Sequence, residues 1–388
     1  MNTETAPLAS TLSPAWNRTA EMPRLTSLAL RALERMFDSE TKLFVFNWNV
    51  DSNTLGPISE RYSAMAAIGL VAAKTRAIDV SLPVNDVIHA LLGRLDAMEQ
   101  RGPGDLALLL WAHVLARGEA PPPVLDRLLP GGNIERLIEK LRTQQLASIA
   151  WTLAAFSTLY RKADQRSLVA ETCERIADLL RSAFDLRTHL FRYHIARESG
   201  TEARFGYHRS FGNFAVQSYP IYALSAYYQA TGDERALRAA QWCADKICAL
   251  QGPQGQWWWI YNVNRGTIAD KFPVFSVHQD GMGPMALGKL ARVAGRDYSG
   301  PIARSFHWLY GDNELGVPMI DFERHWILRA IQRKPLFYQP AYHWNLLRSR
   351  FSAHGLPGDS RLAFGGMETL NETRPYHMGW MLLSFYDD

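Results

Sequence analysis

The sequence has 388 residues, of which 47% are hydrophobic and 21% are charged, and this apolar content excludes a disordered chain. Forty-two Lys and Arg residues against 38 Asp and Glu give a formal charge of +4, without the basic block that nucleic-acid-binding arms carry. The three cysteines, Cys173, Cys243 and Cys248, lack the spacing of a zinc site or a disulfide framework, so we expect buried thiols.

The first 21 residues are rich in Thr, Ala, Pro and Ser and contain no apolar stretch of signal-peptide length. No segment approaches the roughly 18 apolar residues of a membrane span. We therefore expect a cytoplasmic protein with a disordered tail at 1–21, followed by a single domain at 22–388.

From residue 25 onward, amphipathic charged helices alternate with helices that are apolar on nearly every face. A helix of the second kind must be surrounded by protein, so each pair predicts an outer and an inner helix. The predicted outer helices are 25–37, 84–98, 134–141, 167–184, 233–250 and 300–310. The predicted inner helices are 58–72, 104–116, 145–160, 211–231, 274–294 and 375–386.

A short internal repeat accompanies these helices. Residues 37–47 align with 184–194 at Phe, Asp, Thr, Leu and Phe, each copy closing an outer helix and opening an extended stretch, and 255–263 is a looser third copy. Long connections at 47–57, 194–210, 257–273 and 312–374 exceed the usual length between helices. Because the other turns are short, we expect one rim of the molecule to hold a site.

Six such pairs over residues 25–388 resemble the six-hairpin, or (α/α)6-toroid, proteins. That group includes glycoside hydrolases, unsaturated uronidases, sugar epimerases and toroidal polysaccharide lyases. The resemblance implies an all-α toroid whose funnel lies at the N-terminal ends of the inner helices. It is a resemblance of architecture, so no catalytic role is transferred from it.

Polar residues stand at the starts of several inner helices and supply the candidate site. Gly56–Tyr62, Tyr207–Asn213, Lys271–Met285 and Gly365–His377 contain most of them. The candidate catalytic residues are Asp280, His278, Glu60, Glu368, Tyr207, His208 and His377. The candidate substrate-binding residues are Arg61, Tyr62, Arg209, Gln217, Trp257, Trp259, Gln279, Arg374, Tyr376 and Trp380.

Asp280 is the favoured acid or base, because it begins an inner helix, follows an extended stretch and is flanked by glycines. We expect His278 to orient it, and Glu60 or Glu368 to face it across the funnel as the second carboxylate of glycoside chemistry. A capping role for Glu60 and a purely structural role for Asp280 are the alternatives.

These residues favour a carbohydrate-active enzyme of the hydrolase, lyase or epimerase type. Arg61, Arg209 and Arg374 would suit an anionic sugar such as a uronate. A terpene-cyclase-like or prenyl-binding toroid and a non-catalytic glycan-binding scaffold remain alternatives. The sequence has no phosphate-binding loop, dinucleotide fingerprint, zinc-protease or nucleophile-elbow motif, so we expect no cofactor, metal or nucleic-acid partner, and the oligomeric state stays open.

Overall fold

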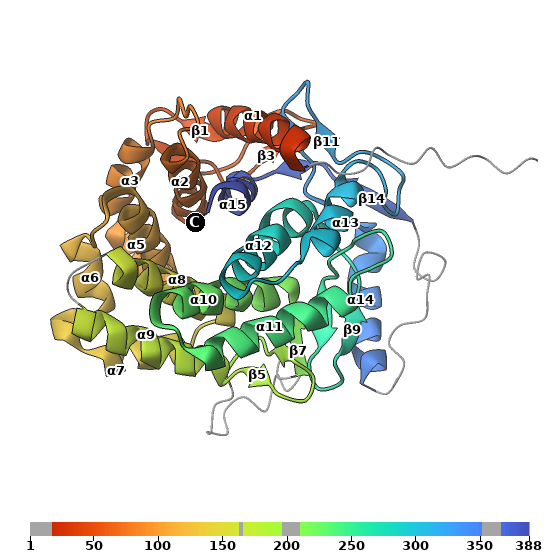
Figure 1. The fold of residues 1–388 in the computed structure, drawn as a ribbon. Helices are drawn as coiled ribbons and strands as arrows, with labels where there is room; N and C mark the ends of the chain where they lie inside the picture. The colour runs from red at the N-terminus through yellow and green to blue at the C-terminus, as the bar shows by residue number, and fades with distance from the viewer. Residues whose placement is uncertain (1–17, 163–165, 196–209, 351–365, 388) are drawn as a thin grey trace, which may run out of the picture.

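The computed structural model describes residues 18–162, 166–195, 210–350 and 366–387. Figure 1 shows a ring of helices around a central axis, with a second layer of helices outside it. The inner ring consists of α2 (Glu60–Thr75), α5 (Pro103–Arg117), α8 (Leu146–Lys162), α10 (Phe214–Thr231), α12 (Gly283–Ala294) and α15 (Pro375–Tyr386). The outer ring consists of α1 (Arg18–Met36), α3 (Val84–Leu92), α4 (Leu95–Arg101), α6 (Pro122–Leu128), α7 (Ile134–Arg142), α9 (Arg166–Arg181), α11 (Glu234–Ala249) and α13 (Ser299–Leu309). The predicted all-α (α/α)6 toroid is confirmed.

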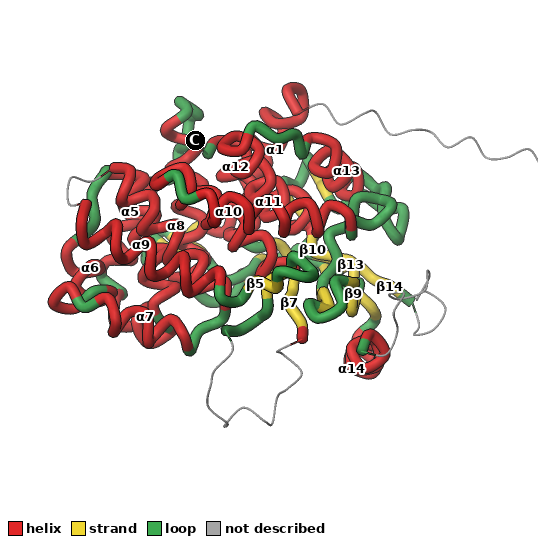
Figure 2. Tube along the Cα trace, turned by 60° about the horizontal axis from the view of Figure 1, so that its bottom comes forward, coloured by secondary structure: helices red, strands yellow, loops and turns green. Residues whose placement is uncertain are grey.

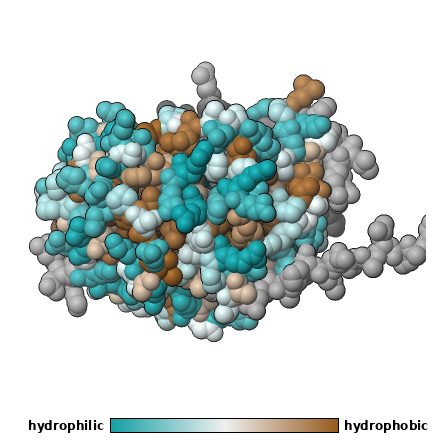
Figure 3. All heavy atoms as spheres, turned by 90° about the horizontal axis from the view of Figure 1, so that it is seen from above, coloured by the Kyte–Doolittle hydropathy of each residue, from teal (hydrophilic) through white to brown (hydrophobic). Residues whose placement is uncertain are grey.

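The difference between the two rings follows from residue spacing. In the outer helix α7, Ile134, Leu137, Ile138 and Leu141 are buried and form one stripe at helical spacing. The inner helix α2 is instead buried along consecutive residues from Ser63 to Ala73. Hydrophilic residues cover most of the face seen in Figure 3, with hydrophobic residues between them. None of the helices in the described ranges is long and apolar enough to cross a membrane.

Glycines allow the first and last inner helices to meet and close the ring. A Cβ placed on Gly69 of α2 would lie 2.0 Å from the carbonyl oxygen of Gly379 in α15, so only glycine permits this approach. Nearby, Thr26 Oγ1 of α1 lies 2.8 Å from the hydroxyl of Tyr386. The two ends of the ring are therefore joined by close packing and a buried hydrogen bond.

Short strands gather at one end of the ring, as Figure 2 shows. Within the described residues, these strands form three two-stranded hairpins and three three-stranded sheets. The hairpins are β1 (Phe37–Asp38) with β2 (Leu43–Phe44), β5 (Phe184–Asp185) with β6 (Leu190–Phe191), and β11 (Ile320–Asp321) with β12 (Trp326–Ile327). The sheets are β7 (Phe211–Asn213), β8 (Ile260–Asn262), β9 (Thr267–Asp270); β10 (Val274–Phe275), β13 (Ala330–Arg333), β14 (Met367–Leu370); and β15 (Glu372–Thr373), β3 (Trp48–Asn49), β4 (Thr54–Leu55).

The three hairpins are structural copies of one another. Each has a non-glycine residue with φ near 60° at the same place, namely Lys42, His189 and His325. Each also has an aspartate whose carboxylate accepts backbone N–H groups of the turn. The repeat at 37–47 and 184–194 is thus confirmed, but its third copy lies at 320–327 and the prediction of 255–263 was wrong. The error arose because the real copy shares the turn aspartate but not the aromatic residues.

Two further predictions need correction. The segment 312–374 contains a helix, α14 (Pro335–Ser349), which packs against β9 and β13. At the other end, α1 begins at Arg18, so the expected disordered tail at 1–21 is wrong for residues 18–21, whose Glu21 accepts a 2.6 Å hydrogen bond from the Tyr310 hydroxyl. Residues 1–17 lie outside the described ranges.

Candidate functional site

A cavity of about 220 Å³ opens at the N-terminal ends of the inner helices. Its walls come from α2, α8, α10, the π-helical turn His278–Met282, α15 and the loop before β13. The lining residues are Arg61, Tyr62, Met65, Gln145, Ala147, Trp151, Ala215, Tyr219, Trp259, Phe275, His278, Met282, Arg329 and Tyr376. Five predicted site residues are among them: Arg61, Tyr62, Trp259, His278 and Tyr376.

His278 stands on one wall among aromatic rings. Its imidazole lies 4.7 Å from Phe214, 5.2 Å from Phe275 and 6.0 Å from Trp259, centroid to centroid. The side chain is almost fully buried, and burial lowers the pKa of His278 to about 3. Its Nδ1 has no hydrogen-bond partner among the described residues. The imidazole is therefore neutral at physiological pH and retains a lone pair.

Two tyrosines whose rings are in tilted contact form another part of the lining. The rings of Tyr62 and Tyr376 lie 4.5 Å apart, and Phe46 stacks on the outer face of Tyr62 at 5.0 Å. Burial raises the pKa of Tyr376 to about 12, so its hydroxyl stays protonated at neutral pH. Arg374 lies outside the lining but donates a 2.9 Å hydrogen bond to the Tyr62 hydroxyl. The wall thus offers aromatic rings and phenolic hydroxyl groups.

Arg61 brings a positive charge to the cavity, and Asp105 and Trp151 contact its guanidinium. Its Nε donates a 2.7 Å hydrogen bond to Asp105 Oδ1, and its guanidinium lies 5.8 Å from the Trp151 ring. Asp105 itself is buried, and burial raises the pKa of that carboxyl despite the neighbouring Arg61. With Arg329, two guanidinium groups line the cavity, beside the positive ends of several helix dipoles.

The predicted carboxylates do not line this cavity. Asp280 is fully buried with its Oδ1 2.6 Å from His377 Nε2, so its partner is His377 and the expectation that His278 orients it was wrong. Burial raises the pKa of Asp280. Glu60 forms ion pairs with Arg94 and Arg101.

Glu368 lies on β14, 3.2 Å from the Gln332 amide, and so also stands apart from the cavity. No Asp or Glu is among the lining residues that the structure describes. These residues therefore do not form the predicted pair of carboxylates across the funnel. The physical reason is that each predicted carboxylate is already paired with an arginine, a histidine or an amide.

Four other predicted residues have positions in the core. Gln217 binds both the N–H and the carbonyl of Phe191 in β6. Gln279 accepts the Trp257 N–H at 3.3 Å, and Trp257 stacks on Phe214 beneath the cavity. Trp380 donates to the hydroxyl of Tyr219, which does line the cavity. These side chains support the walls without contacting the space inside. Tyr207, His208 and Arg209 lie outside the described residues.

Sequence reasoning missed Asp105 and Arg329. Asp105 stands at the start of the second inner helix, which is the same signal that selected the other candidates. Arg329 carries no such signal, because it lies in a connection whose path only the tertiary structure gives.

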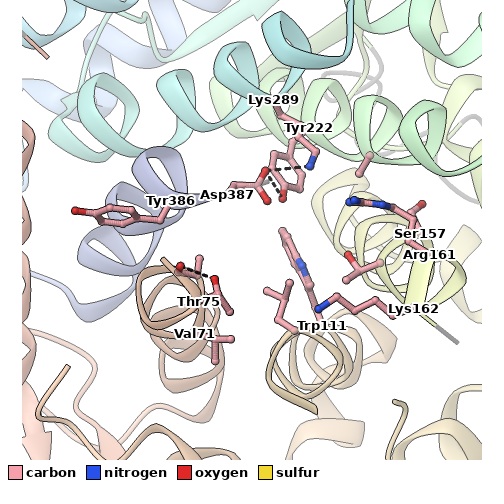
Figure 4. Close-up of a pocket in the computed structure, with 14 residues that line it drawn as sticks. Val71, Thr75, Trp111, Ser157, Arg161, Lys162, Tyr222, Lys289, Tyr386 and Asp387 are labelled. Atoms are coloured by element: carbon pink, nitrogen blue, oxygen red, sulfur yellow. Dashed lines mark hydrogen bonds and ion pairs between the residues drawn. The ribbon is translucent and has the colours of Figure 1, made fainter. Parts of the chain in front are cut away.

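A second cavity, of about 110 Å³, is drawn in Figure 4. Its lining includes Thr75 and Lys162, the last residues of α2 and α8, so it lies at the opposite end of the ring. Its buried Lys289 lies 3.3 Å from Asp387 Oδ2, and the same oxygen accepts hydrogen bonds from Tyr222 and Arg292, both at 3.1 Å. The charge of Asp387 is thus taken up by two cations. Trp111 lines this second cavity, and its ring lies 5.9 Å from that of Trp380, which donates a hydrogen bond to Tyr219 of the first cavity. Because the carboxylate of the second cavity is already paired with Lys289 and Arg292, we take the first cavity as the candidate site.

Comparison with known proteins supports the fold. No family model and no curated protein matches the sequence. Among solved structures, a sugar epimerase from a ruminal bacterium is similar at a TM-score of 0.58 and 11% identity, covering 94% of this chain and 97% of that one. The unsaturated glucuronyl hydrolase from Bacillus sp. GL1 is similar at 0.58 and 12% identity, covering 95% and 96%. An unsaturated glucuronyl hydrolase specific for heparin is similar at 0.57 and 12% identity, with coverage of 95% and 96%. At these identities the likeness establishes the toroid fold.

Proposed function

We propose that this protein is a carbohydrate-active enzyme that moves a proton at a sugar carbon, with the neutral imidazole of His278 as the base. The observation that carries the proposal is the composition of the cavity. It contains one buried histidine, two arginines and a set of aromatic rings, and no carboxylate among its described lining residues.

The chemistry follows from these groups. A neutral imidazole can accept the proton of a carbon next to a carbonyl, and the electron pair of that C–H bond then moves onto the carbonyl oxygen. Arg61 and Arg329 would stabilise the negative charge that develops on this oxygen. Return of a proton to the opposite face gives the epimer, and loss of a neighbouring leaving group gives an unsaturated product.

The low pKa of His278 fits this cycle once a ligand is bound. Burial lowers that pKa, and the charges of His377 and Arg329 lower it further. An anionic sugar would offset the Arg329 charge and raise the pKa of His278 toward neutrality, where a base is most effective. We therefore favour an acidic sugar such as a uronate as the ligand, bound in a cavity with two guanidinium groups.

The likeness to a sugar epimerase and to unsaturated glucuronyl hydrolases agrees with a sugar ligand. We further propose that the Asp280 and His377 pair fixes the π-helical turn on α15 and so positions His278. Such turns within helices are frequent at functional sites.

The proposal is tested by incubation with D-glucose, D-glucuronate and a saturated glucuronyl disaccharide in deuterated water. We expect deuterium at a ring carbon or an unsaturated product, and a loss of at least about 100-fold in rate for His278→Gln. The shift in the midpoint of thermal unfolding is measured with each sugar and, separately, with an isoprenyl diphosphate. Stabilisation by a sugar indicates the sugar enzyme, whereas stabilisation by the diphosphate indicates a prenyl-binding toroid. An unchanged rate in His278→Gln would contradict the proposal.

Hydrolysis is the second candidate, because the buried carboxyl of Asp105, which is not itself a lining residue, accepts a 2.7 Å hydrogen bond from Arg61 of the cavity lining. Burial raises its pKa, as a general acid requires. Release of a reducing end without deuterium at carbon, abolished by Asp105→Asn, would favour this candidate.

A further inference from the structure

Arg329 reaches the cavity from a segment far from every inner helix in sequence. It lies between β12 and β13, and its guanidinium stands 5.2 Å from the Phe275 ring. Its NH1 donates to Glu372 Oε1, while its Nε is buried and has no hydrogen-bond partner among the described residues. A buried N–H without an acceptor is unfavourable, so the Arg329 guanidinium retains donor capacity beyond its bond to Glu372.

Glu372 holds this guanidinium and is itself fixed by several donors. Its Oε1 also accepts from Arg374 Nε at 2.9 Å, and its Oε2 accepts from the Asn47 amide at 2.7 Å. Burial acts to raise the pKa of the Glu372 carboxyl, but Arg329 and Arg374 outweigh it and the pKa is lowered. Glu372 is therefore a carboxylate with both oxygens engaged, and it is not among the lining residues.

The carboxylate of Glu372 also contacts Arg374, which in turn contacts Tyr62 on another wall of the cavity. The Arg374 guanidinium lies 4.3 Å from the Phe46 ring and donates to the Tyr62 hydroxyl at 2.9 Å. The partly buried carboxylate of Glu372 thus joins Arg329, in the link between β12 and β13, to Tyr62 of the first inner helix through Arg374.

We propose that Arg329 contacts the acidic group of the sugar and that Glu372 is a positioning residue that fixes Arg329 and, through Arg374, Tyr62. This inference rests on the proposed function, because it assigns the residue that selects acidic over neutral sugars in that cavity. Charge-assisted pairing of guanidinium with carboxylate supplies the selectivity. Arg329 and Arg61 then approach the ligand from different elements, one held by Glu372 and the other by Asp105.

The test compares binding of sodium D-glucuronate and D-glucose to the full chain by calorimetry. In Arg329→Gln we expect glucuronate to bind about 10- to 100-fold more weakly, as loss of a charge-assisted hydrogen bond implies, with glucose little changed. Arg329→Lys should restore part of the preference, because it keeps the charge but not the planar fork. Arg324→Gln is the matched control, since Arg324 is a 70% exposed arginine of the hairpin that precedes Arg329 and pairs with Asp321, and this variant should bind like the wild type.

Glu372→Gln provides the second measurement. It should raise KM for an acidic substrate more than it lowers kcat, because the guanidinium stays present but loses its fixed position. Equal glucuronate binding in the wild type and Arg329→Gln, or equal weakening for both sugars, would overturn the inference. If His278-dependent turnover persists in that case, the proposed function stands without this inference. If the wild type binds neither sugar, both fail.

Discussion

Ring closure offers a sharp test of the architecture through Gly69→Ala. The new methyl group would lie 2.0 Å from the Gly379 carbonyl oxygen, whereas ordinary contact begins near 3.4 Å. The atom it meets is backbone, so α2 and α15 must separate by more than an ångström. Overpacking of this kind costs about 1 to 3 kcal/mol of the free energy of unfolding, and sometimes more.

Gly288→Ala is the matched control on another inner helix. A Cβ there meets nothing closer than 3.5 Å, the NH1 of Arg292, and Gly288 has no positive φ. Alanine in a helix stabilises by roughly 0.5 to 1 kcal/mol relative to glycine, so this variant should be slightly more stable than the wild type.

Urea unfolding followed by both tryptophan fluorescence and far-ultraviolet circular dichroism measures the two variants. We expect Gly69→Ala to shift both signals together to lower urea, because we propose that residues 22–388 form one domain in which each inner helix depends on two neighbours. Opposite shifts for the two alanine variants are the expected result. If Gly69→Ala were as stable as Gly288→Ala, close approach of α2 and α15 would not be what closes the ring.

Three further outcomes are expected. Asp280→Asn keeps an oxygen that can accept a hydrogen bond from His377, so the variant should fold. If Asp280 only positions His278, turnover should fall by less than about 10-fold. A loss of about 100-fold or more would instead indicate that Asp280 is the acid or base. Removal of residues 1–17 should leave the midpoint of thermal unfolding unchanged, since that segment lacks apolar periodicity, and a lower midpoint would assign it a structural role. The pKa of Glu372 is lowered in the folded protein, so this carboxylate stabilises the fold above its ordinary pKa of 4.5, and the stabilisation is lost as the pH falls through the folded-state pKa. In unfolding experiments from pH 7 to pH 3, Glu372→Gln should therefore lose less stability on acidification than the wild type. An equal dependence of stability on pH in the two proteins would contradict this expectation.

The sequence by itself determined the alternation of helices, because burial of a helix face requires apolar residues at helical spacing and that spacing is local. Ile134, Leu137, Ile138 and Leu141 predict an outer helix without knowledge of any partner. The same local signal, a polar cluster at an inner-helix start, placed Arg61 and His278 at the cavity correctly.

Only the tertiary structure decided which side chains face one another. Glu60 begins an inner helix as predicted, yet its carboxylate pairs with Arg94 and Arg101, which stand just before the start and at the end of α4. Asp280 pairs with His377, 97 positions away, although His278 is only two positions away in sequence. Arg329 enters the cavity because β13 pairs with β10 and β14 and carries the preceding loop to the funnel. Such pairings depend on distances between elements far apart in the chain, and no local periodicity encodes them.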